Sequence, residues 1–236
     1  MVQKRTRAPK SGVKSAPAKV ATTASMSPEA TATKRRGRPR AFESEVALGR
    51  ALDTFRDSGF AATSLDDLSA AMGINRPSLY GAFGDKRELF LKAYERYRAE
   101  AGVLFAKAFD PALSLRVTLE RVYAIAIDFY AAGENGPRGC LTVMTAASEA
   151  MADPEIRQIA QNAIAGADRN LTRRIQKAIE DGELPKSANA VALGQVASAM
   201  FHTLAIRARA GVPRAELEAL VRGTIDLIAG PAKPRR

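Results

Sequence analysis

At 236 residues and 46% hydrophobic side chains, the chain can bury one large core or two modest ones, so a folded globular protein is expected. A single cysteine excludes an internal disulfide framework and fits a reducing compartment, and a single histidine argues against a structural zinc site, so neither a metal nor a cofactor is expected. The formal net charge of +11 indicates a polyanionic partner.

The positive charge is concentrated at the N-terminus. Residues 1–40 hold eleven Lys or Arg and one acid, Glu29, so the rest of the chain is nearly neutral. Because this segment is rich in Ala, Lys, Pro, Ser and Thr and lacks apolar periodicity, residues 1–38 are predicted to be a disordered basic arm. A transit peptide is the alternative, but four prolines interrupt any amphipathic helix there, and no apolar segment for secretion exists. The expected location is the cytoplasm.

From residue 43 onward, apolar residues recur at helical spacing, whereas strict alternation is hard to find, so the body is predicted to be all-α. The first expected helix ends at Gly59, which suits the left-handed C-terminal position. Ser64 and Asp67 form a capping-box pair at the start of the second helix, and Gly73 ends it after about two turns.

The stretch GINRPSLYGAF, residues 73–83, predicts a third helix of only about two turns. Asn75 or Arg76 caps it, and Pro77 lies in the first turn, where its missing N–H costs nothing. A longer helix follows. Two short helices joined by a tight turn at Gly73 are a helix-turn-helix, and a short helix that exposes its N-terminal residues can enter the major groove of B-DNA end-on.

Residues 37–90 contain a group of residues whose identities and spacing together form a specific pattern. The set comprises Phe55, Gly59, Thr63, Ser64, Leu68, Gly73, Ser78, Leu79, Tyr80, Phe83 and Lys86. In this spacing the segment resembles the N-terminal domain of the tetracycline-repressor (TetR/AcrR) family of bacterial transcriptional regulators. The resemblance implies a homodimer, a helical C-terminal domain with an effector pocket, and release from a DNA operator when a ligand binds. One residue departs from the pattern, since Ala82 stands where many members carry His or Tyr.

The resemblance and the helical periodicity together give an expected organisation with about nine helices. The expected parts are a disordered basic arm (1–38), a three-helix helix-turn-helix DNA-binding domain (39–88), a helical effector-binding and dimerisation domain (89–230) and a basic C-terminal tail (231–236).

The resemblance also implies which side chains meet double-stranded DNA. Arginine can bind guanine O6 and N7 together, so the first turn of the third helix is expected to read bases, while flanking residues hold phosphates. The alternative for Tyr80 is a partly buried packing residue, and for Lys86 an ordinary solvated charge. The expected base contacts are Asn75, Arg76, Pro77 and Ser78, and the expected phosphate contacts are Thr63, Ser64, Tyr80 and Lys86.

The basic sequence RRGRPR, residues 35–40, resembles the core of an AT-hook, in which a Gly-Arg-Pro unit inserts arginine into a narrow minor groove. Arg38 and Arg40 are therefore expected to enter the minor groove. The alternative is a basic segment that raises affinity for any DNA sequence by counterion release, which is the preferred interpretation for residues 4–19.

Two long apolar helices are predicted in the C-terminal half, over residues 115–130 and 156–178. The first is apolar on most sides and is expected to form a wall of an effector pocket. Membership of an ordinary core is the alternative for each residue expected to line the pocket. The pocket candidates are Phe105, Tyr123, Ile127, Tyr130, Met144, Phe201 and His202.

Residues 187–206 carry no formal charge over nearly the length that a bilayer requires, but polar residues within them argue against a membrane span and favour a buried interface helix. In the family that the sequence resembles, the last two helices form the dimer interface, and a twofold dimer demands a pseudo-palindromic operator. Packing within one chain is the alternative. The expected interface residues are Gly194, Ala197, Ser198, Met200, Leu217, Leu220, Val221, Thr224 and Ile228.

Cys140 lies in the segment GENGPRGCLTVM, where glycines and a proline interrupt the chain before a new helix. A helix N-terminus and the nearby cation Arg138 favour a reactive thiol, and some family members with a similar Gly-Cys segment sense oxidants, electrophiles or copper. A sensing thiol is one hypothesis for Cys140, and a small buried hydrophobe is the other.

The sequence therefore predicts a homodimeric, sequence-specific DNA-binding regulator, a repressor released from its operator by a small-molecule or thiol-reactive effector. The alternative is a sequence-independent nucleoid protein, because the arm resembles linker-histone tails. An enzyme is not expected. Cys140 and His202 are the only candidates for a nucleophile and base pair, nothing places them together, and neither a phosphate loop nor a metal-ligand cluster is present.

Overall fold

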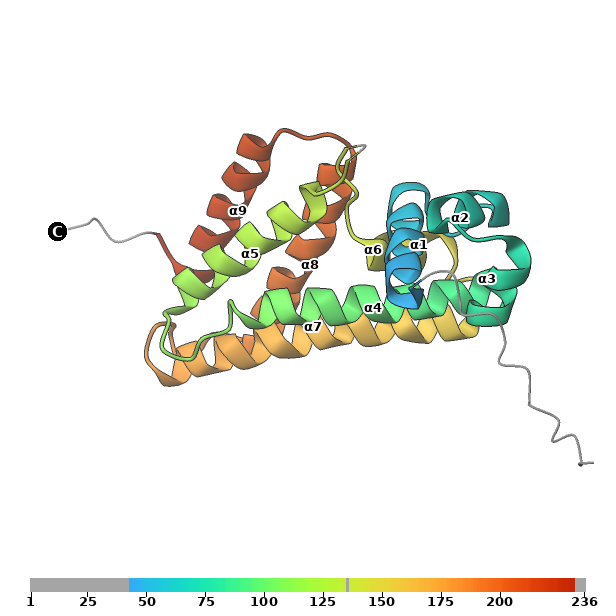
Figure 1. Ribbon diagram of the computed structural model, residues 1–236. Helices are drawn as coiled ribbons and strands as arrows, with labels where there is room; N and C mark the ends of the chain where they lie inside the picture. Colours follow the sequence, from blue (N-terminus) through green and yellow to red (C-terminus); the bar gives the residue numbers. More distant parts are fainter. Residues whose placement is uncertain (1–42, 135, 232–236) are drawn as a thin grey trace, which may run out of the picture. The chain divides into compact units, whose positions relative to one another are not determined.

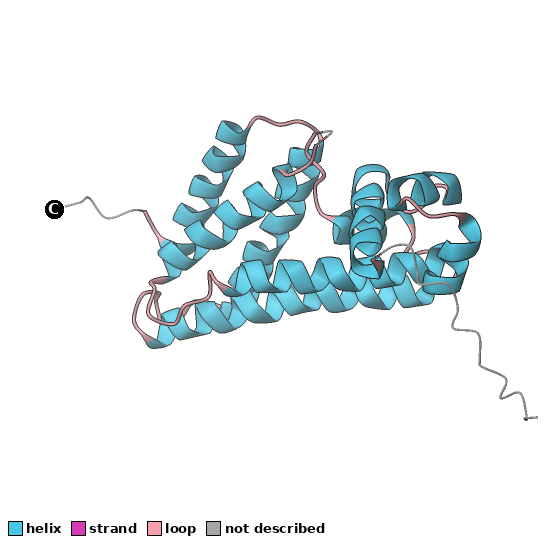
Figure 2. Ribbon diagram, in the orientation of Figure 1, coloured by secondary structure: helices cyan, strands magenta, loops and turns pink. Residues whose placement is uncertain are grey.

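The computed structural model describes residues 43–134 and 136–231, and within these ranges the regular structure is entirely α-helical (Figure 1). Figure 2 shows helices joined by loops and confirms the predicted all-α fold. The predicted basic arm, with Arg38 and Arg40, and the predicted tail beyond residue 231 lie outside the described residues. The helices are α1 (Ser44–Ser58), α2 (Leu65–Met72), α3 (Arg76–Phe83), α4 (Lys86–Ala106), α5 (Leu115–Ala131), α6 (Leu141–Ser148), α7 (Pro154–Glu180), α8 (Ala190–Arg209) and α9 (Arg214–Ala229).

Helices α1 to α3 form the predicted helix-turn-helix unit, and local sequence explains their limits. Ser64 and Asp67 make a capping box at the start of α2, in which Ser64 Oγ accepts the Asp67 N–H and the Asp67 carboxylate accepts the Ser64 N–H. Gly73 ends α2 with a φ of 67°, a left-handed conformation that glycine adopts without strain. The chain then turns to Asn75, which caps α3.

The core of this unit depends on a fourth helix. Phe55 of α1, Leu68 of α2 and Leu79 of α3 are fully buried and pack in one cluster with Phe90 of α4. The Phe55 and Phe90 ring centroids lie 5.1 Å apart with the rings perpendicular, a favourable arrangement for aromatic pairs. The two short helices α2 and α3 are therefore held from behind by α1 and α4.

Helix α4 takes part in two cores. Its N-terminal residues pack with α1 to α3, whereas Phe105, near its C-terminus, packs against the buried residues of the C-terminal helices. The helix begins at Lys86 and continues without a break through the domain boundary that was predicted after residue 88. One helix therefore links the helix-turn-helix unit to the C-terminal helices.

The C-terminal core is built mainly from α5, α7, α8 and α9. Helix α8 lies very close to α7, because a Cβ atom added at Gly194 would lie only 2.8 Å from Thr172 Cα. None of the described helices combines the length and apolarity needed to cross a membrane.

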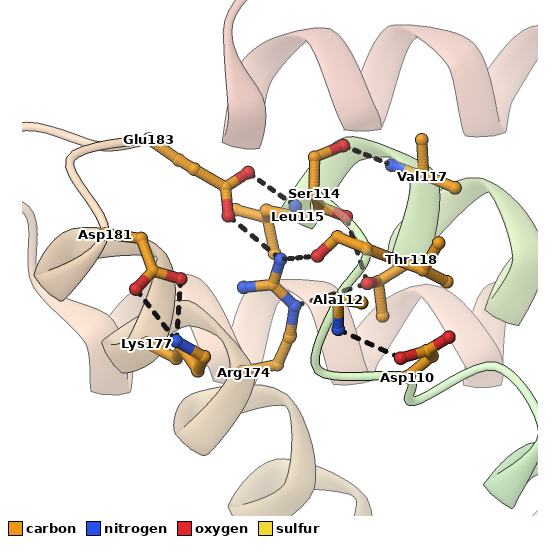
Figure 3. Close-up of polar contacts among 11 residues, drawn as sticks. Asp110, Ala112, Ser114, Leu115, Val117, Thr118, Arg174, Lys177, Asp181 and Glu183 are labelled. Carbon is orange, nitrogen blue, oxygen red and sulfur yellow. Dashed lines mark hydrogen bonds and ion pairs between the residues drawn. The ribbon is translucent and has the colours of Figure 1, made fainter.

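A buried arginine ties the C-terminal end of α7 to the start of α5, as Figure 3 shows. Arg174 is 8% exposed and donates to Leu113 O at 2.8 Å, to Thr118 Oγ1 at 3.2 Å and to Glu183 Oε1 at 3.0 Å. The other oxygen of Glu183 accepts the Leu115 N–H at 2.6 Å. A buried charge is tolerated when it is paired and hydrogen-bonded in this way.

Candidate functional site

The first turn of α3 brings the four predicted base-contact residues together at one end of a short helix. Asn75 Oδ1 accepts the Ser78 N–H at 2.9 Å, so the side chain of Asn75 caps the helix as well as lying at its exposed end. Arg76 and Pro77 are exposed and Ser78 is half-buried, whereas Leu79 points into the core. The polar residues of this turn therefore face away from the supporting helices.

The Arg76 guanidinium is held by an acid of the neighbouring helix. Its Nη2 donates to Asp66 Oδ2 at 2.8 Å and its Nε donates to Asp66 Oδ1 at 3.0 Å. The two side chains are still 53% and 76% exposed. Sequence reasoning missed this pair, because the spacing of ten residues spans a turn whose geometry is set only in the folded unit.

Three of the four predicted phosphate contacts are accessible. Tyr80 is 49% exposed on α3, and Ser64 is exposed at the start of α2. Lys86, the first residue of α4, is half-buried and its Nζ lies 4.5 Å from the centroid of the Phe60 ring. This cation–π contact holds the ammonium group beside a helix N-terminus, where the helix dipole disfavours a cation.

Thr63 is the exception and requires a correction. Its side chain is 1% exposed, and the hydroxyl donates to Gly59 O at 2.6 Å. The hydroxyl thus satisfies a backbone carbonyl left free at the end of α1, and it is not presented to a phosphate. The sequence pattern alone could not distinguish this structural role of the Thr63 side chain from a phosphate contact.

A cavity of about 230 Å³ lies among residues from α4, α5, α6, α7 and α8. Most of its lining is aromatic or aliphatic, which is typical of small-molecule sites. No Asp or Glu is found among its described lining residues. Four of the predicted pocket residues line it, and so does the predicted sensing thiol. These residues are Phe105, Tyr130, Phe201, His202 and Cys140.

Three predicted pocket residues lie elsewhere. Tyr123 and Ile127 are buried in the C-terminal core, and the Tyr123 hydroxyl donates to Ala197 O at 2.9 Å. Met144 lies beside Gly59 at the end of α1. Helical periodicity identifies which side chains are buried, but not which buried side chains border a cavity. The sequence alone therefore could not distinguish these three residues from those that line the cavity.

Other lining residues were missed as pocket candidates. Tyr97 and Arg98 come from α4, and Asn170 comes from α7. One signal in the sequence points to Tyr97, because this residue falls on the apolar stripe of α4. The partners of that stripe are set by tertiary packing, which the pattern does not specify.

The polar groups of the cavity are mainly neutral hydrogen-bonding groups. The Tyr97 hydroxyl donates to Cys140 Sγ at 3.3 Å. Burial raises the pKa of Tyr97 and Tyr130 well above the ordinary value, so both phenols keep their protons. Burial lowers the pKa of His202, against a smaller opposing effect of Asp168, so the imidazole is mostly neutral at pH 7.

Helix α1 reaches into the wall of this cavity through Arg56. The side chain is 8% exposed, and its guanidinium carbon lies 4.9 Å from the ring centroid of Phe129 and 5.6 Å from that of Tyr97. Its Nη2 donates to Phe129 O at 3.2 Å. Phe129 and Tyr97 both line the cavity, so one residue of the helix-turn-helix unit rests on the cavity wall.

Two further arginines hold the C-terminal end of α1. Arg138, two residues before Cys140, forms ion pairs with Asp53 at 2.7 Å and with Asp57. Arg209 of α8 donates to the backbone carbonyls of Arg138 and of the last turn of α1. The segment that leads into Cys140 is therefore fastened to the helix-turn-helix unit.

The residues predicted for a dimer interface are mostly covered within one chain. Gly194 faces Thr172 of α7, and only Leu220 and Thr224 of the predicted set are half-buried. Small-residue spacing predicts close helix approach, but the partner of α8 on that face is α7 of the same chain. The buried members are Gly194, Ala197, Ser198, Met200, Leu217, Val221 and Ile228.

The other faces of α8 and α9 expose a different set of small and apolar residues. Val196 is 55% exposed, Ile206 59% and Leu227 87%. A Cβ atom added at Gly223 would meet no atom within 4 Å. We call this set the α8/α9 surface; it comprises Ala192, Val196, Ala199, Ile206, Ala219, Gly223 and Leu227.

Both halves of the chain match family models. Residues 47–93 match the model described as bacterial regulatory proteins, tetR family, and residues 118–223 match the model of the tetracyclin repressor-like C-terminal domain. The first range contains the helix-turn-helix unit, and the second contains most of the cavity-lining helices.

Individual proteins of known family are also similar to this chain. The chain is 27% identical to the HTH-type transcriptional repressor ComR of Escherichia coli (strain K12) over 195 residues, which cover 82% of this chain and 92% of ComR. It is 34% identical to the repressor BdcR of the same organism over 124 residues, covering 52% and 61% of the two chains. A cysteine mutant of the TetR family transcriptional regulator CifR, solved with double-strand operator DNA, is 31% identical with a TM-score of 0.73, over 80% of this chain and 98% of that chain.

Proposed function

Because the chain belongs to the tetR family of bacterial regulatory proteins, we propose that it is a repressor that binds operator DNA as a homodimer and is released by a small-molecule or thiol-reactive effector. The exposed first turn of α3 is the observation that supports DNA reading. Arg76 and Pro77 lie at the free end of a two-turn helix that α1 and α4 hold from behind. Such an end fits the major groove, and the similar protein CifR is complexed with operator DNA.

Competition binding tests this function. The full chain is titrated with a duplex covering the region upstream of its own gene, against random-sequence duplex DNA at the same salt concentration. A regulator prefers the upstream duplex by roughly a thousandfold or more, and Arg76→Ala lowers that preference. Equal affinity of the wild-type chain for both duplexes would instead identify a sequence-independent nucleoid protein.

The α8/α9 surface supports the proposal of a homodimer. Exposed apolar side chains such as Val196 and Leu227 gather on two neighbouring helices, and Gly223 leaves room for a second helix to approach. A second copy of the chain would cover the same residues on both subunits, as a twofold interface requires. Two copies would then present two α3 helices to two half-sites of one operator.

The cavity supports the proposal of an effector. Its volume admits a small molecule, its lining is mostly apolar, and Cys140 offers a thiol beside the Tyr97 hydroxyl. Arg56 rests on the ring of Phe129, and Arg138 lies two residues from the thiol. A ligand that displaces Phe129, or an adduct on Cys140, would disturb contacts between α1 and the cavity wall.

Thiol modification tests the covalent route separately. Wild-type protein and Cys140→Ser are treated with N-ethylmaleimide or hydrogen peroxide, and binding to the upstream duplex is measured before and after. We expect modification to weaken binding by the wild-type chain about tenfold or more, a typical size for allosteric coupling, and to leave Cys140→Ser unchanged. A folded protein whose thiol does not react would exclude this route and leave a non-covalent effector.

A further inference from the structure

The pair formed by Asp66 and Arg76 carries an inference that rests on the proposed function and makes it more specific. We infer that Asp66 is a positioning residue for base reading: it fixes which edge of the Arg76 guanidinium faces the DNA and thereby makes each half-site prefer guanine at one position. Asp66 itself is not required to touch a base.

The hydrogen bonds define the free edge. Arginine has five N–H donors, one on Nε and two on each terminal nitrogen. In this protein the side edge, formed by Nε and Nη2, is used by the two oxygens of Asp66 at 3.0 Å and 2.8 Å. The end edge, formed by Nη1 and the second hydrogen of Nη2, is left for a ligand. Arg76 is 53% exposed, so this part of the side chain is accessible.

The end edge matches guanine among the four bases. Two parallel donors need two adjacent acceptors, and guanine presents O6 and N7 in the major groove. Adenine pairs its N7 acceptor with an N6 donor, cytosine presents a donor, and thymine presents one acceptor beside a methyl group. A fixed end edge therefore discriminates more sharply than a mobile arginine, which can rotate to reach a phosphate or a single acceptor.

Both partners are anchored to the ends of rigid helices. Asp66 lies in the first turn of α2, which the capping box of Ser64 and Asp67 fixes, and Arg76 is the first residue of α3, which Asn75 caps. The backbone positions of both residues are therefore fixed by their helices, and the hydrogen bonds between the two side chains fix the orientation of the Arg76 guanidinium in addition. Without Asp66, the long arginine side chain would lose several rotational freedoms on meeting DNA.

An acid near DNA has a second effect of opposite sign. The charge of Asp66 repels phosphates, so its removal alone raises affinity for every duplex to a similar degree. Positioning predicts a different outcome, because the preference among bases falls even where overall affinity rises. Base preference is thus the measurement that separates the two effects.

The test selects preferred sequences from a library of random duplexes with the full chain, followed by competition between duplexes that differ at one base pair. The wild-type chain should select guanine at one position of each half-site, and Arg76→Ala should lose it. Asp66→Ala should lower the guanine preference about tenfold with an unchanged unfolding temperature, and Asp66→Asn, which keeps one acceptor, should restore part of it.

Asp67→Ala is the matched control, because it removes the same charge from the same turn but breaks the capping box instead. It should lower the unfolding temperature and keep the guanine preference. Two outcomes would overturn the positioning role of Asp66 without affecting the proposed function. One is an equal loss of guanine preference in Asp66→Ala and Asp67→Ala, and the other is a uniform rise in affinity of Asp66→Ala with its guanine preference intact. Only a guanine preference that survives Arg76→Ala would also count against base reading by Arg76.

Discussion

Arg56 is a cation that the fold covers almost completely, with 8% of its surface exposed and its Nε without a hydrogen bond within the described residues. A buried cation is usually paired with a carboxylate, but two aromatic rings stabilise this one. The ring centroids of Phe129 and Tyr97 lie within 6 Å of the guanidinium carbon. The charge of a residue on α1 is therefore stabilised by the side chains that line the cavity, and this contact depends on the shape of the cavity wall.

Replacement of Arg56 by alanine removes both ring contacts and the hydrogen bond to Phe129 O. We expect the free energy of unfolding to fall by about 2–3 kcal/mol, measured by urea denaturation. Arg50→Ala is the control, because Arg50 is exposed on the same helix and its loss should cost no more than about 0.5 kcal/mol. Similar small losses for both variants would contradict the importance of the ring contacts.

At the scale of single elements, α7 and α8 approach each other closely at Gly194. Alanine usually stabilises a helix relative to glycine, but a Cβ here would lie 2.3 Å from Thr172 Oγ1. We expect Gly194→Ala to lower the free energy of unfolding by about 1–3 kcal/mol, because the two helices must separate. Gly102→Ala, where a Cβ meets nothing within 4 Å, should raise it by about 0.5–1 kcal/mol. Chemical denaturation of both variants gives the comparison.

The start of α7 makes one contribution to stability depend on pH. Hydrogen bonds from Arg87 of α4 lower the pKa of Asp153, the N-cap of α7, to about 2 from its ordinary 3.8. A lowered folded-state pKa stabilises the fold fully above about pH 3.8, and this contribution is lost as the pH falls toward 2. Asp153→Asn keeps a capping side chain but not the charge. Its unfolding free energy should fall less steeply than that of the wild-type chain in this pH window, and equal slopes would contradict the assignment.

Local signals in the sequence predicted the limits of the two short helices of the helix-turn-helix, whereas the partners of each helix face required the structure. Ser64, Asp67, Gly73 and Asn75 act within a few residues of their own positions, so their capping and turn roles could be predicted. The partner of Gly194 lies more than twenty residues away and depends on how α7 and α8 pack. The same limit explains why only some of the predicted effector residues line the cavity and why the pairing of Arg76 with Asp66 was missed.

At the scale of the whole molecule, the proposed homodimer depends on the α8/α9 surface. A charge placed on this surface should prevent association, so Val196→Asp is expected to sediment as a monomer at micromolar concentration and to bind the upstream duplex weakly. Val103→Asp is the control, because Val103 is 63% exposed on α4 and lies outside this surface. A dimer that survives Val196→Asp, or that fails equally in both variants, would place the interface elsewhere.

The continuity of α4 has a thermodynamic consequence. Its first turns belong to the core behind the helix-turn-helix, and Tyr97, Arg98 and Phe105 further along it line the cavity. If a non-covalent effector weakens operator binding through this helix, the operator must weaken effector binding by the same factor, because the coupling free energy is shared. Protein already bound to a promoter would then require a higher effector concentration than protein free in the cell. Each additional operator copy would raise the effector concentration at which the genes respond.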